Sequence, residues 1–137
     1  MKPKETILSI QLAVSNIAAS AAFYGGILDL PLQHALTANG APEHFVIRSG
    51  SMEIVFVEDE GVLREHPALA ERLSLYPRGV GVTLHFTVTN IEEIADALNE
   101  EGLDIFYPLT IHPFGIKELW CHDPDGYLVV LEEPVSR

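Results

Sequence analysis

Two titratable side chains, Glu53 and His85, are the candidate catalytic residues of this sequence. Each lies in a segment with the residue types of a half-exposed β-strand. A carboxylate and an imidazole on one partly apolar surface can work as a general acid and base on a carbonyl substrate. The alternative interpretation is that both are polar residues facing a cavity, without a catalytic role.

A wider set of side chains completes the candidate binding surface. Residues two apart on a strand share a face, and a mostly apolar face with a few polar groups is typical of a ligand pocket. We expect the following residues to bind a ligand: Gln11, Glu53, His85, Thr87, Phe114, Leu119, Cys121 and Val130. Trp120 is expected to point the other way, towards a helix. Cys121 is either a reactive thiol or an inert buried residue.

The strands that carry these residues belong to an internal repeat. Residues 10–17 (Ile-Gln-Leu-Ala-Val-Ser-Asn-Ile) match residues 84–91 (Leu-His-Phe-Thr-Val-Thr-Asn-Ile) at a separation of 74 positions. Alternation before each Asn predicts a half-buried strand, and apolar residues at steps of three and four after it predict a helix. Each half of the chain is therefore expected to begin with a strand and a helix.

Three short strands are expected after each helix. They fall at about 31–36, 43–49 and 52–57 in the first half, and at about 104–107, 116–122 and 127–132 in the second. Gly50-Ser51 is typical of a tight hairpin turn. Asp123-Pro124-Asp125-Gly126 has the residue order of a type I turn. Each half is thus expected to be a β-α-β-β-β module.

Both predicted helices begin at an asparagine. The side chain of Asn16 or of Asn90 can accept a hydrogen bond from a free N–H of the first turn. Asn90 together with Glu93 also forms a plausible capping box. The sequence therefore predicts asparagine caps at both helices.

The chain is expected to form a single domain over residues 1–137. Module one takes about 6–57, a connector about 58–79, and module two about 80–133. The connector is polar, with a short helix expected from Leu63 to Leu73. We interpret it as surface packing, with a lid over a pocket as the alternative.

The composition excludes several classes of partner. The chain has 137 residues, of which 47% are hydrophobic, and this is enough for one core. Its 20 acidic and 8 basic residues give a net charge of −12, which repels nucleic acid and anionic lipid. This charge either favours a cationic ligand or serves solubility. One cysteine and no long apolar stretch near residue 1 predict a cytoplasmic protein with no membrane partner.

The order of these motifs resembles the vicinal oxygen chelate superfamily, which includes glyoxalase I, extradiol dioxygenases, fosfomycin-resistance enzymes and bleomycin-resistance proteins. The resemblance covers about residues 7–133. It is carried by the tandem modules, by Ala22-Phe23-Tyr24 with Ile27-Leu28, and by Pro113-Phe114-Gly115 running to Asp123-Pro124-Asp125-Gly126. It implies an α+β fold in which two modules curl into a cup of mixed sheets, completed in a homodimer.

The metal enzymes of this superfamily hold their ion with four side chains on the floor of the cup. On the motifs of the family, these positions fall at Ser9, Val55, Thr83 and Val130. Valine has no donor atom, and a neutral hydroxyl is a poor ligand for a divalent ion without carboxylate or imidazole support. We therefore expect no metal there and no other cofactor. The alternative is a displaced metal set two residues along the strands, made of Gln11, Glu53, His85 and Glu132.

The resemblance leaves two main functions open. The first, which we favour, is a metal-free protein that binds and sequesters a small molecule, as in the bleomycin-resistance branch. In that branch a Pro-Trp-Gly segment helps to line the ligand groove, and here its counterpart is Pro113-Phe114-Gly115. The second is a glyoxalase-like lyase, isomerase or dioxygenase that uses Glu53 and His85 or a displaced metal. A regulatory module with an empty cup is a third possibility.

Overall fold

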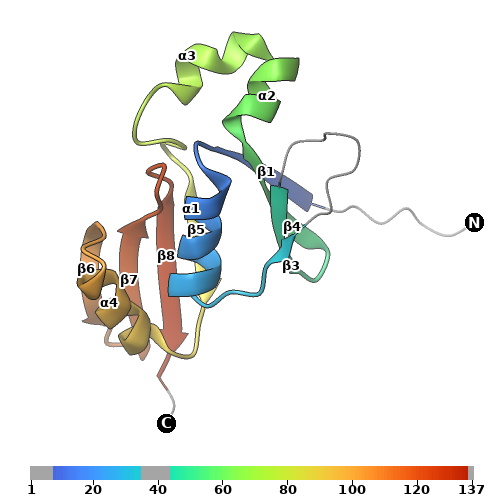
Figure 1. The fold of residues 1–137 in the computed structure, drawn as a ribbon. Helices are drawn as coiled ribbons and strands as arrows, with labels where there is room; N and C mark the ends of the chain where they lie inside the picture. Colours follow the sequence, from blue (N-terminus) through green and yellow to red (C-terminus); the bar gives the residue numbers. More distant parts are fainter. Residues whose placement is uncertain (1–7, 35–43, 136–137) are drawn as a thin grey trace, which may run out of the picture. The chain divides into compact units, whose positions relative to one another are not determined.

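The computed structural model describes residues 8–34 and 44–135 of the chain. They form two compact units that divide between Leu75 and Tyr76, inside the expected connector. The described residues contain two four-stranded mixed sheets and four α-helices, so the fold is α+β, as the sequence predicts (Figure 1). The single domain and the completion of the cup in a homodimer stay predictions.

The first unit is built on a sheet with the strand order β1-β4-β3-β2. Its strands are β1 (Leu8–Val14), β2 (Gln33–His34), β3 (His44–Ser49) and β4 (Met52–Glu58). β1 runs parallel to β4, and β3 runs antiparallel to both of its neighbours. The helix after β1 is α1 (Ile17–Ala21), which continues as a π-helical segment over Ala22–Ile27. The strand expected at 31–36 lies partly outside the described residues.

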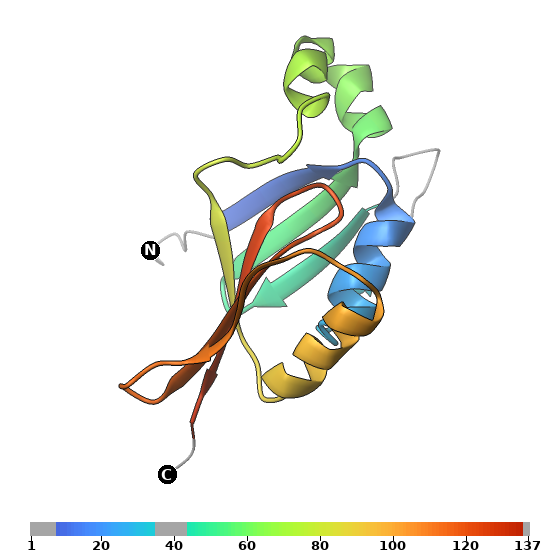
Figure 2. The same cartoon turned by 90° about the vertical axis from the view of Figure 1, so that its left-hand side faces the viewer.

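The second unit repeats this plan with the strand order β5-β8-β7-β6. Its elements are β5 (Thr83–Thr87), α4 (Ile91–Glu100), β6 (Ile105–Ile111), β7 (Ile116–His122) and β8 (Leu128–Pro134). β5 runs parallel to β8, and β7 runs antiparallel to β6 and β8. α4 packs against β6, β7 and β8 (Figure 2). The β-α-β-β-β order expected for both halves is confirmed.

Strand alternation gives each sheet a buried face, where the helix of its unit packs, and an open face. In the first unit the ring of Tyr24 lies 4.6 Å from that of Phe56, which stacks on Phe45 at 4.4 Å. In the second unit, α4 buries one side of the helix: Ile91, Ile94, Ala95 and Leu98. Most of the large aliphatic residues therefore lie on the helix side, and the open faces carry polar groups together with some apolar and aromatic ones.

A carboxylate from the last strand of each unit holds the first N–H of the helix of that unit. Glu58 Oε1 accepts from the Ile17 N–H at 3.1 Å, and Glu133 Oε1 accepts from the Ile91 N–H at 2.8 Å. The first N–H groups of a helix have no partner within the helix, and a negative charge there is favourable. Each helix is thus tied to the end of its sheet.

The asparagine caps agree with the sequence at one helix only. Asn16 Oδ1 accepts from the Ala19 N–H at 3.0 Å, so this cap is confirmed. The side chain of Asn90 makes no capping hydrogen bond, and the capping box expected with Glu93 is wrong. Glu133 caps this helix instead.

The connector is helical, but it is broken in the middle. α2 (Asp59–Glu65) and α3 (Ala70–Leu73) are separated by a 3-10 turn at Pro67–Leu69, where the sequence predicts one helix from Leu63 to Leu73. α2 packs against β1 and β4. Among the described residues, no helix has the length and apolarity needed to cross a membrane.

The loop between β7 and β8 has five residues, one more than the turn itself. The Gly126 N–H donates to the carbonyl of Asp123 at 3.0 Å, as in the expected type I turn. Asp123 Oδ1 accepts from the N–H groups of Asp125 and Tyr127, both at 2.9 Å. Gly126 has a φ of 87°, and a Cβ there would lie 2.7 Å from Pro77 of the same unit. The loop is therefore fixed in both shape and length.

The carboxylate cap of α4 can be tested by Glu133→Ala. We expect the free energy of unfolding to fall by about 1 kcal/mol, because the Ile91 N–H loses a charged acceptor at the helix N-terminus. Urea denaturation followed by circular dichroism measures the change. The control is Asp96→Ala, at an exposed position in the middle of α4, which should not destabilise the protein. An equal loss in both variants would contradict the capping role.

Candidate functional site

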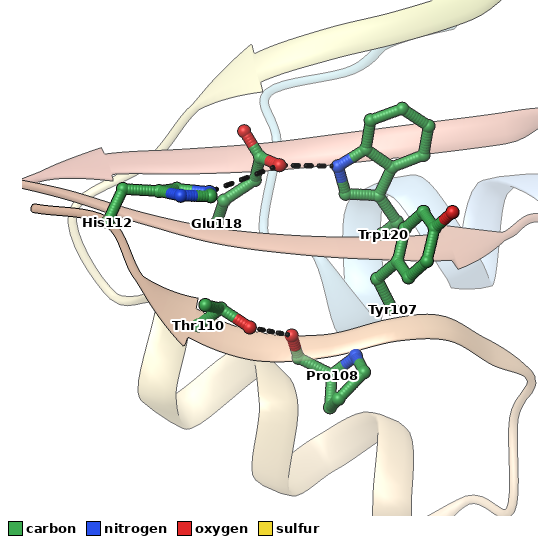
Figure 3. Close-up of a pocket in the computed structure, with 6 residues that line it drawn as sticks. All are labelled: Tyr107, Pro108, Thr110, His112, Glu118 and Trp120. Atoms are coloured by element: carbon green, nitrogen blue, oxygen red, sulfur yellow. Dashed lines mark hydrogen bonds and ion pairs between the residues drawn. The ribbon is translucent and has the colours of Figure 1, made fainter.

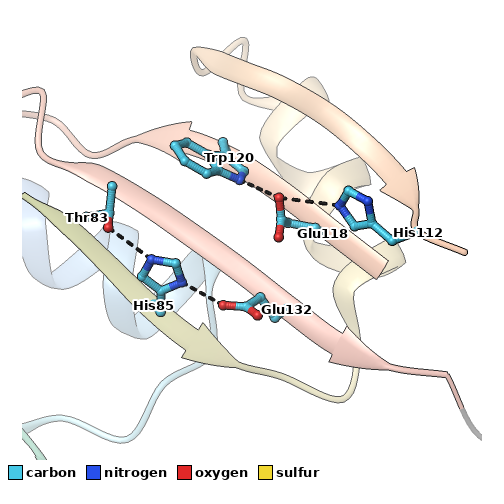
Figure 4. Close-up of polar contacts among 6 residues, drawn as sticks. All are labelled: Thr83, His85, His112, Glu118, Trp120 and Glu132. Atoms are coloured by element: carbon cyan, nitrogen blue, oxygen red, sulfur yellow. Dashed lines mark hydrogen bonds and ion pairs between the residues drawn. The ribbon is translucent and has the colours of Figure 1, made fainter. Parts of the chain in front are cut away.

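Three polar side chains form a hydrogen-bonded chain on the open face of the second sheet. Glu132 Oε1 lies 2.6 Å from His85 Nδ1, and His85 Nε2 lies 2.9 Å from Thr83 Oγ1 (Figure 4). Thr83 and His85 are two apart on β5, and the parallel strand β8 supplies Glu132. A hydroxyl, an imidazole and a carboxylate are thereby joined in the Thr83–His85–Glu132 chain.

A pocket of about 290 Å³ opens on the neighbouring strands of the same unit. Its lining residues come from β6, β7 and the turn between them: Tyr107, Pro108, Thr110, His112, Glu118 and Trp120 (Figure 3). The pairing of β6 with β7 shifts register on both sides of Tyr107. Such irregularities re-aim side chains, and here they accompany a pocket wall made of β6 side chains. We call this pocket the aromatic pocket.

A carboxylate lies among the rings of the aromatic pocket. The ring of Trp120 lies 5.3 Å from that of Tyr107 in an edge-to-face arrangement. Glu118 Oε1 accepts from the Trp120 Nε1–H at 2.7 Å and lies 3.5 Å from His112 Nε2. The ring of Phe114 stacks on His112 at 5.2 Å and is 71% exposed. The structure thus places Phe114 beside the pocket, in the turn after β6.

The aromatic pocket and the Thr83–His85–Glu132 chain share one face of one sheet. Val130 of β8 pairs with His85 on one side and with Trp120 on the other, and its side chain is fully buried. Two strand spacings separate β5 from β7, or roughly 10 Å. Val130 therefore forms the floor between a polar and an aromatic region.

The first unit has a smaller pocket of its own, of about 270 Å³. Gln11 and His44 line it from the sheet, and Gly61, Val62, Glu65 and His66 line it from α2 and its end. The connector therefore supplies a pocket wall, which agrees with the alternative interpretation better than with simple surface packing.

The two candidate catalytic residues have partners of their own. Glu53, in the first unit, pairs with Arg48 at 3.0 Å and accepts from the Ser9 hydroxyl at 3.3 Å. His85, in the second unit, bonds to Glu132 and Thr83. Their joint action as an acid–base pair stays a prediction, and the carboxylate that His85 contacts within its own unit is that of Glu132.

The side chains at the metal positions of the family do not fit a divalent ion. Val55 and Val130 offer no donor atom, and the hydroxyls of Ser9 and Thr83 are bonded to Glu53 and His85. Arg48 adds a positive charge next to Glu53. Residues 8–34 and 44–135 contain no cluster of three or more His, Cys, Asp or Glu residues arranged to hold a metal.

The face assignment of β7 from the sequence is wrong by one residue. Leu119 and Cys121 pair with Leu131 and Val129, and both lie on the buried helix side with at most 1% exposure. Trp120, expected to point towards a helix, lies on the open face instead. The reason is Tyr127, which adds a fifth residue to the loop, and a shift of one residue exchanges the two faces of a strand.

The remaining residues expected to bind a ligand lie on the open faces, except Phe114, which lies in the turn after β6. Thr87 is exposed on β5 beside Glu132. Sequence reasoning missed Tyr107, Thr110 and Glu118, because the irregular register of β6 leaves no period to follow. Glu118 could have been found from Val130, since strand pairing places the two on one face once the loop length is known.

The fold defines a protein of paired β-α-β-β-β modules. The family model described as "Glyoxalase/Bleomycin resistance protein/Dioxygenase superfamily" matches residues 6–131. The chain belongs to this superfamily. A search of curated proteins found no match.

Solved structures share the fold at low sequence identity. The hypothetical protein SA1046 from S. aureus is 16% identical, with a TM-score of 0.67 over 96% of this chain and 95% of its own. A superfamily member from Sphaerobacter thermophilus DSM 20745 is 19% identical, with a TM-score of 0.63 over 95% and 98%. A lactoylglutathione lyase from Agrobacterium tumefaciens is 20% identical, with a TM-score of 0.54 over 96% of each chain.

The burial of Cys121 predicts an unreactive thiol. Desolvation, followed by the charges of Asp123 and Asp104, raises the pKa of Cys121 from 9.0 to about 12. Thiolate is the reactive form, so the folded protein should not react with Ellman's reagent at pH 8, whereas the protein in urea should. Rapid labelling of the folded protein would contradict this.

The same pKa shift predicts a loss of stability in alkali. Between pH 9.0 and about 12 the unfolded thiol releases its proton while the folded thiol of Cys121 keeps it. The unfolded state then binds fewer protons, so the free energy of unfolding falls as the pH rises. Thermal unfolding measured across this range should show a smaller fall in Cys121→Ala.

Proposed function

We propose that this chain is a small-molecule-binding protein of its superfamily, that it acts without a metal at the ligand positions of the family, and that its ligand is a planar aromatic cation. The observation that carries the proposal is the aromatic pocket, in which the carboxylate of Glu118 lies beside Trp120 and Tyr107. A volume of about 290 Å³ suits a small organic molecule.

The chemistry of the pocket favours a cation with a flat apolar surface. Aromatic rings attract cations through their negative faces, and tryptophan does so most strongly. Glu118 accepts one hydrogen bond from Trp120. A carboxylate has about four acceptor sites, so capacity remains for a ligand donor. The net charge of −12 adds a long-range attraction for cations.

The absence of a metal from the proposal rests on the side chains themselves. Two of the four positions are valines, and the hydroxyls of the other two are already bonded within the protein. A protein that sequesters its ligand needs only to bind it tightly and does not need a metal for a reaction. The homodimer and the cytoplasmic location that the sequence implies stay predictions.

Ligand binding can be read directly from Trp120, because it is the only tryptophan in the chain. Titration with 1-methylquinolinium should quench its fluorescence with saturation, and neutral quinoline should bind more weakly. Glu118→Gln keeps an acceptor for the Trp120 N–H but removes the charge, and we expect roughly tenfold weaker binding of the cation.

The control for this experiment is Glu100→Gln, an equal change of charge at the exposed end of α4, which should bind like the native protein. Quenching that rises linearly with the 1-methylquinolinium concentration, without saturation, in the native protein would contradict the proposal. Equal affinity in Glu118→Gln would show that the carboxylate does not contact the cation.

Metal content tests the other half of the proposal. Purified, untagged protein soaked in zinc, nickel, manganese or iron salts and then desalted should hold far less than one ion per chain by elemental mass spectrometry, because the valines offer no donor. Stoichiometric metal that disappears in His85→Ala would instead support the displaced set around His85.

A further inference from the structure

The Thr83–His85–Glu132 chain has a fixed direction for its protons. An ionised carboxylate can only accept, so the 2.6 Å contact with Glu132 requires that His85 Nδ1 carry a hydrogen. In the neutral ring, Nε2 is then the acceptor, and the Thr83 hydroxyl 2.9 Å away must donate to it. The proton of Thr83 therefore points at a base.

The strands hold this geometry in place. Thr83 and His85 are exposed on alternate positions of β5, and the register of β5 with β8 sets the position of Glu132. Threonine is stiff at χ1 because its Cβ is branched, and short bonds to a charged group are strong. The side chain of His85 is 51% exposed, so the pair is open to a reagent from solution.

We propose that Thr83 is a nucleophile for acyl transfer, with His85 as its general base and Glu132 as the positioning residue that fixes the imidazole tautomer. A hydroxyl activated by a carboxylate-oriented histidine is the arrangement that nucleophilic catalysis requires. The negative charge of Glu132 and of the whole chain disfavours anionic phosphate esters. The substrate class is therefore an uncharged or cationic carboxylic ester with a good leaving group.

The reaction balances without an external oxidant or reductant. Thr83 Oγ forms a bond to the carbonyl carbon of the ester while its proton moves to His85 Nε2. Collapse of the tetrahedral intermediate breaks the bond between that carbon and the leaving oxygen, which departs as an alcohol or phenol with the proton from Nε2. Water then adds to the acyl carbon while its proton moves to His85 Nε2. Collapse breaks the bond between that carbon and Thr83 Oγ, which takes the proton from Nε2 as the carboxylic acid leaves.

This activity goes beyond ligand binding in the aromatic pocket and is tested separately. Native protein is incubated with 4-nitrophenyl acetate, and the acetylated position is located by peptide mass spectrometry. We expect an acetyl group on Thr83 and a burst of 4-nitrophenolate. Peptide mapping separates this product from acetylation of lysines and of the amino terminus.

Matched variants decide the roles. Thr83→Val keeps the shape and should abolish the burst, His85→Asn should slow it roughly 100-fold, and Thr83→Ser should retain it. Thr89→Val removes a different exposed hydroxyl and should behave as the native protein. An unchanged burst in Thr83→Val, or no acetyl group on Thr83 of the native protein, would overturn the proposal.

The role of Glu132 has a readout that a purely structural role would not move. In Glu132→Ala, nitrogen NMR of the His85 ring should show a shift from the Nδ1–H tautomer towards the Nε2–H tautomer, together with a slower burst. A native Nδ1–H population in Glu132→Ala would remove Glu132 from the mechanism. Retained quinolinium binding in the same variants shows that the aromatic pocket is intact.

Discussion

The bond between a strand-end carboxylate and a helix N-terminus is the constraint on which both units depend. In each unit the first strand leads directly into a helix, and that helix must lie across the sheet that the strand enters. Glu58 and Glu133 hold these helices in place: each accepts a hydrogen bond from a backbone N–H, that of Ile17 or that of Ile91. The partners are 41 and 42 residues apart in the chain. Because these carboxylates lie at the ends of the strands that pair in parallel with β1 and β5, one contact sets the start of the helix and the end of the sheet together.

Fixing the helix on one face decides what the other face can do. Most of the large apolar residues of each strand lie beneath the helix that follows the first strand. The alternate residues lie on the open face, which in the first unit is partly lined by α2. In the second unit these include hydrogen-bonding groups on β5 and β8 and aromatic rings on β6 and β7, with Val130 between them. The same face of one sheet thus carries both the Thr83–His85–Glu132 chain and the aromatic pocket.

The elements could be predicted from the sequence because their periodicity is local, and the parts that could not be predicted depend on long-range register. The repeat located the first strand and helix of both halves, and the Asn16 cap is a contact over three residues. The cap by Glu133 could not be predicted from local sequence, because Glu133 lies 42 residues from Ile91 in the chain. Tyr127 lies in the loop and not in β8, and this shifts the pairing of β7 with β8 by one residue. Leu119, expected to line the pocket, is therefore buried, and Trp120 lies on the open face. The register shifts of β6 follow no residue pattern that could be read from the chain.

The five-residue loop between β7 and β8 has a consequence for how such a protein can diverge. Gly126 has no room for a side chain beside Pro77, and Asp123 binds two N–H groups of the loop, so the segment tolerates few changes in length. Substitutions on the open face alter only the chemistry of the pocket. The insertion or deletion of a single loop residue that shifted the register of β7 would instead exchange its two faces and bring a different set of side chains to the open face. A residue exchange on the open face therefore keeps the register of β7, whereas a change of loop length would exchange the two faces of that strand.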